Sequence, residues 1–323
     1  MTVEKWIDAV AKEIVAALDW EYQYAWNEAS NEAEEWDFNT ETPPQPTDAA
    51  NFIIEQFKKW QASTSGSKEA HQEIKINLIN IQIRENIKTL FAVESGSRAW
   101  GFPSPDSDYD VRFVYVRPRD WYLSIEPGRD VIELPLEGDM DINGWDLKKA
   151  LGLLLKPNPV LLEWLTSPVK YIWNEGACSE LLALAKKVTH GHACLHHYLS
   201  LGSRQWTTYV DDKDQVNLKK YLYAVRPAMA IRWLRMYPEL IPPMNFYDLK
   251  QAINLTPELE ELLDNLLEQK SLSKELGEAP RIKPIDEFIT SEFNWAETAI
   301  KKSRPVRPDL SEEANDIFRK WVE

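Results

Sequence analysis

Apolar residues recur at a helical period near the start of the chain and again after a proline-rich break. The first set predicts an amphipathic helix, and its members are Ile7, Val10, Ala11, Ile14, Val15 and Leu18. After the break at 42–48, a second helix is expected to present Phe52, Ile53, Phe57 and Trp60 on one side. Residues 62–67 have the composition of a linker. We therefore treat residues 1–66 as an acidic helical N-terminal extension.

Beyond the linker the pattern predicts strands first and helices afterwards. One helix is expected to end near residue 87, and the strands that follow it are expected at 89–93, 110–116, 131–136 and 140–143. Helical spacing then dominates, at 147–155, 160–165, 179–188, 196–209, 216–236, 247–253, 257–269 and 285–300. This order indicates an α+β fold with a mixed sheet and a helical domain behind it. We place the sheet domain at 67–175 and the helical domain at 176–323.

Composition and charge narrow the class of protein. The apolar stretches are too short to span a membrane, no apolar run follows a basic start, and the two cysteines do not suggest a disulfide framework. We therefore expect a cytoplasmic protein. The net charge of −15 argues against a protein that simply coats nucleic acid. Residues 190–235, however, contain seven Lys or Arg against three Asp, which leaves room for an anionic substrate.

The segment 95–112 combines a glycine-serine turn with two aspartates one residue apart, and it reads SGSRAWGFPSPDSDYDVR. The turn can direct backbone N–H groups near Gly96 and the Ser97 hydroxyl at phosphate oxygens. Asp108 and Asp110 share one face of the next strand because strand side chains alternate, so they can share a divalent cation. A phosphate cradle beside metal-binding carboxylates is what phosphoryl or nucleotidyl transfer requires.

This segment resembles the signature of the nucleotidyltransferase superfamily that contains DNA polymerase β, which is Gly-Ser followed, after a spacer, by Asp-x-Asp. It looks like one branch in particular, the nucleotidyltransferases that are often encoded beside RNA ligases and are associated with RNA repair. Segments 141–147, 158–164 and, more weakly, 219–233 carry the similarity further, so it covers roughly residues 85–250. The resemblance implies a mixed-sheet catalytic domain, an NTP substrate and Mg²⁺ or Mn²⁺ as cofactor.

The resemblance also implies a third carboxylate on a neighbouring strand, and three aspartates are candidates. Asp141 lies in the middle of the expected fourth strand, with its neighbours directed to the core, so we expect it to complete the metal site with Asp108 and Asp110. Asp139 could equally be a turn residue, and Asp146 is better placed to cap the next helix.

Further residues are candidates for binding the nucleotide. Gly96 and Ser97 are expected to hold the β- and γ-phosphates, and glycine suits a backbone that must approach a ligand closely. Arg98 either pairs with a phosphate or forms a surface salt bridge. On the expected helix 216–236, Lys219 and Arg226 share a face and are our candidates for the triphosphate, with Arg204 in reserve. Their alternative role is an exposed basic face that pairs with Asp211, Asp212 and Asp214.

The leading hypothesis is therefore a metal-dependent nucleotidyltransferase. It would move a nucleoside monophosphate from an NTP to a hydroxyl and release pyrophosphate, and the acceptor implied by the resemblance is an RNA 3′ end such as that of a tRNA. One alternative is the transfer of AMP to a protein side chain. Another is a nucleotide-binding scaffold without turnover, which docks a protein partner through the acidic N-terminal helices.

Overall fold

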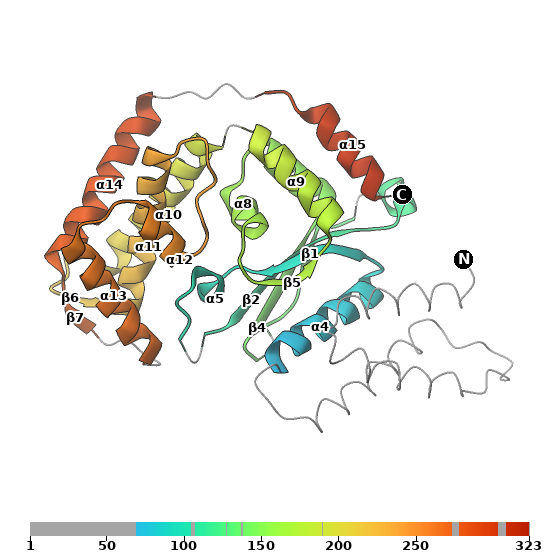
Figure 1. Ribbon diagram of the computed structural model, residues 1–323. Coiled ribbons are helices and arrows are strands. Elements are labelled where there is room, and N and C mark those ends of the chain that lie inside the picture. Colours follow the sequence, from blue (N-terminus) through green and yellow to red (C-terminus); the bar gives the residue numbers. More distant parts are fainter. Residues whose placement is uncertain are drawn as a thin grey trace, which may run out of the picture.

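A five-stranded mixed sheet forms the first half of the described part of the chain (Figure 1). The computed structural model describes residues 69–104, 107–126, 128–136, 138–188, 190–272, 278–302 and 308–322. The helices expected before residue 66, and the docking surface proposed on them, lie outside these ranges. The strands are β1 (Lys88–Glu94), β2 (Tyr109–Val116), β3 (Val131–Glu133), β4 (Met140–Asp146) and β5 (Lys170–Trp173).

The order of the strands is β3-β4-β2-β1-β5, and β2 and β4 are parallel while the other pairs are antiparallel. The two strands that carry the candidate carboxylates are therefore direct neighbours. Along β2, Val111 and Phe113 pack in one hydrophobic cluster and Val114 and Val116 in the other, as strand alternation requires.

Helices cover both faces of the sheet. On one face lies α4 (Glu69–Glu85), which shares its cluster with Val111 and Phe113. The other cluster contains α7 (Leu147–Leu155), α8 (Pro159–Leu165) and α9 (Glu175–Lys187). Because Asp110 and Arg112 alternate with Val111 and Phe113, they point to this second side of the sheet.

The second half of the chain is helical and lies beside the sheet (Figure 1). Its elements are α10 (Gly191–Tyr209), α11 (Leu218–Met236), α12 (Phe246–Ala252), α13 (Pro257–Leu272) and α14 (Lys283–Lys302). Helices α10, α11 and α14 pack against one another, and the short strands β6 (Gln215–Asn217) and β7 (Glu278–Pro280) pair. The last helix, α15 (Ser311–Trp321), returns to pack on α7 and α9.

The α+β fold class is confirmed, with differences in detail. The third strand ends at Glu133 and the fourth continues to Asp146, whereas β5, the β6–β7 pair and α15 are not anticipated by the sequence pattern. The boundary expected at residue 175 stays a prediction, and α9, which follows it, packs beside the sheet on β1, α7 and α8. Within the described ranges, no helix combines the length and the apolar character that crossing a membrane demands.

Candidate active site

The glycine-serine turn and the strand with the two aspartates touch directly at Gly96. The Ser95 N–H donates to the Asp110 carbonyl at 2.9 Å, and the short helix α5 (Ser97–Trp100) begins right after Gly96. A Cβ atom added at Gly96 would lie 1.7 Å from Oδ2 of Asp110. Glycine is therefore required here, because the Asp110 carboxylate occupies the space of any larger side chain.

We expect Gly96→Ala to reduce nucleotidyl transfer by about a hundredfold, because the new methyl group must displace the Asp110 carboxylate. The measurement is the rate of pyrophosphate release. Gly152→Ala in α7 is the matched control, since nothing lies within 4 Å of its added Cβ, and it should leave the rate unchanged. Equal rates for Gly96→Ala and the parent protein would show that the close contact is unimportant.

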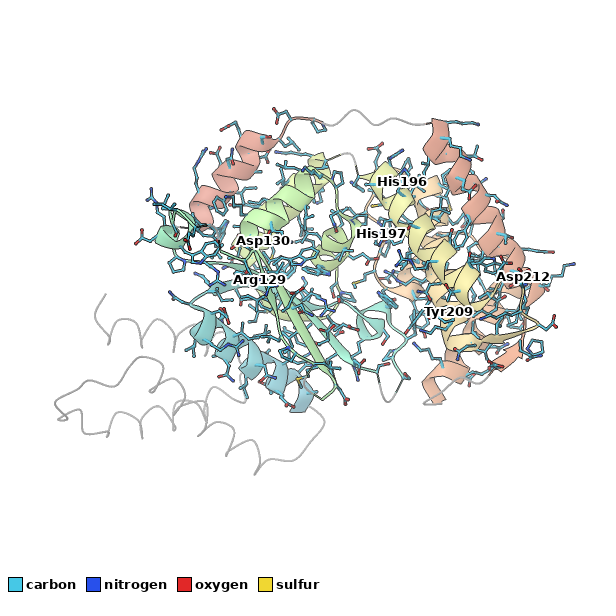
Figure 2. All side chains as sticks on the ribbon, turned by 180° about the vertical axis from the view of Figure 1, so that it is seen from behind. Arg129, Asp130, His196, His197, Tyr209 and Asp212 are labelled. Carbon is cyan, nitrogen blue, oxygen red and sulfur yellow. The ribbon has the colours of Figure 1, made fainter. Side chains whose placement is uncertain are left out.

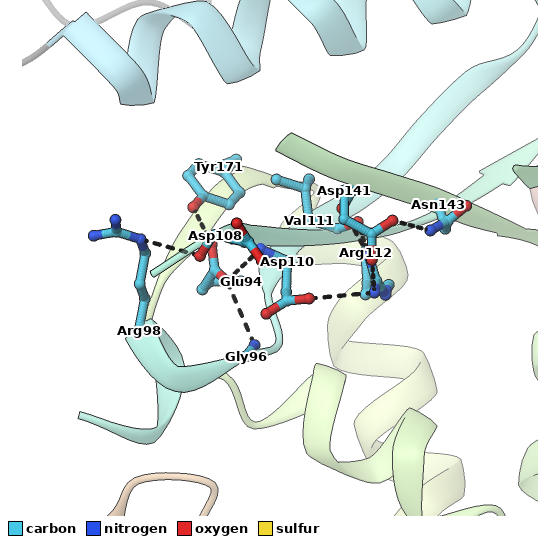
Figure 3. Close-up of polar contacts among 10 residues, drawn as sticks. All are labelled: Glu94, Gly96, Arg98, Asp108, Asp110, Val111, Arg112, Asp141, Asn143 and Tyr171. Atoms are coloured by element: carbon cyan, nitrogen blue, oxygen red, sulfur yellow. Dashed lines mark hydrogen bonds and ion pairs between the residues drawn. The ribbon is translucent and has the colours of Figure 1, made fainter. Parts of the chain in front are cut away.

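Asp110 and Asp141 lie side by side on neighbouring parallel strands. They are register partners on β2 and β4, and Asp108 lies exposed just before β2 begins (Figure 3). Burial raises the pKa of Asp110, and the nearby charges of Glu94, Asp141 and Asp108 raise that pKa further, while Arg112 opposes them. The sheet thus brings the three predicted carboxylates within electrostatic reach of one another.

The guanidinium of Arg112 lies between the two paired aspartates. Its Nη2 is 2.6 Å from Oδ2 of Asp141 and 3.5 Å from Oδ1 of Asp110. The second Asp141 oxygen accepts a hydrogen bond of 2.5 Å from Nδ2 of Asn143 (Figure 3). Both oxygens of Asp141 therefore already have a donor from the protein.

These carboxylates fit a divalent cation by their chemistry, since Mg²⁺ and Mn²⁺ prefer carboxylate and phosphate oxygens. The guanidinium between Asp110 and Asp141 shows directly that this position holds positive charge. In the described ranges, however, no three His, Cys, Asp or Glu side chains are grouped closely enough to hold a metal ion. The three-carboxylate metal site stays a prediction.

The other two aspartates have structural positions, as their sequence contexts suggested. Asp146 caps α7 by accepting a hydrogen bond of 2.8 Å from the Lys148 N–H. Asp139 lies in the turn that follows Gly138, which has a φ of +58°. Asp146 points to the other face of β4 from Asp141, and Asp139 precedes the strand.

Glu94, the last residue of β1, holds the glycine-serine turn by hydrogen bonds. Its buried carboxylate accepts the Asp110 N–H at 2.8 Å, the Gly96 N–H at 3.4 Å and the Tyr171 hydroxyl at 2.6 Å. Burial, followed by the Glu94 charge, raises the pKa of Tyr171, which keeps its hydroxyl a donor. The Gly96 N–H therefore points to Glu94, whereas the expectation was that it would help bind phosphate. Ser97 is half-buried, and its hydroxyl has no protein partner among the described residues.

We expect Glu94→Ala to destabilise the protein by about 1–3 kcal/mol, because it leaves buried N–H groups without an acceptor. Glu94→Gln should cost less, since the amide oxygen can still accept from Gly96 and Asp110. Urea denaturation measures both values. An equal loss for the two variants would show that the charge of Glu94 matters and that its hydrogen bonds to the turn do not.

Arg98 and Arg226 are both engaged with the protein. The Arg98 guanidinium donates to the carbonyls of Ser107 and Asp108 and lies 3.8 Å from the ring centre of Tyr109, so it holds the segment leading into β2. Arg226 is 2% exposed and pairs with Glu163 at 2.8 Å.

The expectation that Arg226 reaches the triphosphate is therefore not supported. Helical spacing correctly places Arg226 on one face of α11, but that face is buried against α8 and the segment before α12. Lys219 is the second residue of the same helix, and its side chain is outside the described part of the structure. Arg204 is exposed on α10.

Helix α11 nevertheless faces the carboxylates through Tyr223. The Tyr223 ring packs edge-on against that of Trp100 in α5, with 5.7 Å between their centres, and burial, followed by the charges of Asp110 and Asp108, raises the pKa of Tyr223. Lys220 Nζ lies 5.4 Å from the Tyr223 ring centre and 4.8 Å from that of Tyr209. Tyr209 lies at the end of α10 (Figure 2). Lys220, one position beyond the predicted Lys219, is thus a basic residue of α11 whose described side chain lies beside Tyr223.

The segment after α5 is anchored in the helical half. Lys270 of α13 is buried, and its Nζ donates to the Phe102 carbonyl at 2.8 Å. The ring of Phe246, at the start of α12, packs edge-on against that of Phe102, with 5.5 Å between their centres. The glycine-serine turn is therefore held by both halves of the molecule.

Comparisons with known proteins identify the family of this chain. Residues 70–320 match the RNA repair pathway DNA polymerase beta family. The Bacillus subtilis (strain 168) protein YcgL, described as uncharacterized, is 40% identical over 252 residues, which are 78% of this chain and 96% of that protein. A crystal structure of a nucleotidyltransferase-like protein from Exiguobacterium sibiricum has 13% sequence identity, covers 76% of this chain and 79% of its own, and has a TM-score of 0.25.

Proposed function

This chain belongs to the RNA repair pathway DNA polymerase beta family and is thus a nucleotidyltransferase. We propose that it moves a nucleoside monophosphate from an NTP to the 3′ hydroxyl of an RNA. Pyrophosphate is the second product. The observation that carries this proposal is the pairing of Asp110 with Asp141 on parallel strands, directly beside Gly96 and Ser97. A reactive phosphate and a metal-binding carboxylate must lie this close for nucleotidyl transfer.

In this proposal the carboxylates bind the cofactor and the turn binds the substrate. Asp108 and Asp110 hold the divalent ion, Mg²⁺ or Mn²⁺, and Asp141 completes the carboxylate set. When bound, such an ion neutralises phosphate charge and lowers the pKa of an attacking hydroxyl. The Ser97 hydroxyl, which has no partner in the described part of the protein, donates to a phosphate oxygen.

Lys220 and Tyr223 are the proposed contacts of the nucleotide on the helical half. Lys220 supplies a positive charge, which is needed because the nucleotide enters a site that already contains several carboxylates. Tyr223 adds an aromatic ring near Asp108 and Asp110, on which a base can stack. Together they replace Arg226, which is buried, in the set of proposed ligands.

The RNA acceptor is supported by the family description, which names an RNA repair pathway. The net charge of −15 favours contact with a short RNA end over contact with a long duplex. The same charge favours a protein acceptor as the second candidate, in which the protein transfers AMP to a side chain.

The test is a turnover assay with each of the four α-labelled NTPs and Mg²⁺ or Mn²⁺. The acceptors are a short RNA, the same RNA with a blocked 3′ hydroxyl, a tRNA, and lysate proteins. We expect label in the RNA only when its 3′ hydroxyl is free, with an equal amount of pyrophosphate. Label in protein alone would identify AMP transfer to proteins. Thermal stabilisation by nucleotide without pyrophosphate release would indicate a scaffold and contradict the proposal.

A further inference from the structure

Arg112 lies on the same strand face as the carboxylates of the candidate site. It follows Asp110 by two residues on β2 and therefore points to the same face of the sheet. Its register partner on β4 is Asn143, one same-face position beyond Asp141. The parallel register thus places one cation and two anions side by side on neighbouring strands.

The guanidinium is fixed by more than the two carboxylates. Nη1 donates to the Asp141 carbonyl at 2.7 Å and to the Val111 carbonyl at 3.0 Å, while Nη2 contacts the carboxylates of Asp141 and Asp110 (Figure 3). The Arg112 side chain is 18% exposed, compared with 33% for Asp110 and 34% for Asp141. The Arg112 side chain is therefore more buried than the two carboxylates, and its hydrogen bonds to the backbone carbonyls of Val111 and Asp141 fix the orientation of the guanidinium.

The negative charges of the carboxylates around Asp110 require a positive charge beside them, because Asp110 is partly buried. Asp141 is the register partner of Asp110, the Glu94 carboxylate accepts the Asp110 N–H at 2.8 Å, and the Arg112 guanidinium lies 3.5 Å from Oδ1 of Asp110. A carboxylate that is partly buried beside like charges is stable as an anion only with a positive partner. In the described part of the protein, Arg112 is that partner.

We propose that Arg112 is a resident cation between Asp110 and Asp141, at the position that a divalent ion bridging these two carboxylates would occupy. The nucleotide-free protein then binds one divalent ion, through Asp108 and Asp110. In this nucleotide-free state Asp141 is held by Arg112 and Asn143 and does not contribute to that ion. This inference rests on the proposed function, because it concerns the same carboxylates and the same cofactor.

A purely structural salt bridge would behave differently. If Arg112 only holds β2 and β4 together, its loss would weaken the fold and leave the number of bound ions unchanged. If it takes the place of an ion, removing its charge creates a second binding position. The count of bound ions therefore separates the two roles.

The experiment counts Mn²⁺ bound to the nucleotide-free full chain by electron paramagnetic resonance, which needs no turnover. We expect one ion for the parent protein, two for Arg112→Gln, and one for Arg112→Lys, which keeps the charge. The double variant Arg112→Gln with Asp141→Asn should return to one ion. Arg119→Gln, an exposed arginine of α6 (Arg119–Tyr122), is the matched control and should bind one.

The single variant Asp141→Asn keeps the inference testable even if Arg112→Gln does not fold. It should bind its one ion with the affinity of the parent protein. An affinity at least tenfold weaker, or an Arg112→Gln protein that folds and still binds one ion, would overturn the inference. A parent protein that binds one ion and releases no pyrophosphate with any NTP would instead remove the proposed function and leave the role of Arg112 intact.

Discussion

Asp110→Asn is expected to reduce nucleotide incorporation by on the order of a thousandfold, the largest loss of activity among the variants considered. Asp110 touches Gly96, pairs with Asp141 across the strands and contacts Arg112. The amide keeps the shape of the side chain and removes its charge, so the loss reports the charge itself. The measurement is single-turnover incorporation of a labelled NMP into RNA with saturating NTP.

Asp139→Asn is the control for Asp110→Asn, because Asp139 is exposed in the turn just before β4. It should retain the parent rate within about twofold. The urea midpoint of both variants is compared, so that a folding defect is not mistaken for a loss of catalysis. A rate within tenfold of the parent for Asp110→Asn would exclude Asp110 from the proposed chemistry.

Arg226→Met is expected to destabilise the protein by about 3–5 kcal/mol, because it leaves a buried carboxylate without its partner. Glu163 is 11% exposed in its side chain and is held by Arg226 at 2.8 Å and by the Tyr198 hydroxyl at 2.9 Å. Burial, followed by the Glu163 charge, raises the pKa of Tyr198, so its hydroxyl stays a neutral donor to Glu163 and supplies no positive charge. Urea denaturation measures the change in free energy of unfolding.

The double variant Arg226→Met with Glu163→Leu should recover most of that stability, since an apolar pair can replace a buried ion pair. Arg204→Met on the exposed side of α10 serves as the control and should change stability by less than about 0.5 kcal/mol. If Arg226→Met costs less than about 1 kcal/mol, the pair with Glu163 is not the structural element that its burial indicates.

The elements that the sequence predicts best are those with a strong local pattern. The strands at 89–93 and 110–116 and the helix at 147–155 have uniform apolar periods, and the structure contains each of them within one or two residues. Strand β5 is only four residues long and forms the edge of the sheet. Its partner β1 is about 80 residues earlier in the sequence, so a local pattern could not reveal it.

Some site residues could likewise be predicted from a local pattern, whereas others depend on the tertiary structure. Alternation predicts a shared face for Asp108 and Asp110, but β2 begins at Tyr109 and Asp108 precedes it. The choice of Asp141 needs only one further assumption, that β4 lies beside β2, and the two strands are neighbours. The role of Glu94 depends on where the turn closes, because it binds backbone N–H groups of two separate segments. Arg226 failed as a phosphate ligand because helical spacing gives the face of a residue without telling whether that face is exposed.

The bond between Lys270 and the Phe102 carbonyl also bears on how the molecule is made. The two residues are 168 positions apart, so a nascent chain still on the ribosome cannot close the end of the glycine-serine turn until residue 270 has emerged. Contacts of such long sequence separation form late and slow the folding of the segments that they join. The substrate cradle is therefore expected to mature after the sheet beneath it, and a prematurely terminated chain would expose an unfinished cradle to the quality-control proteases of the cell.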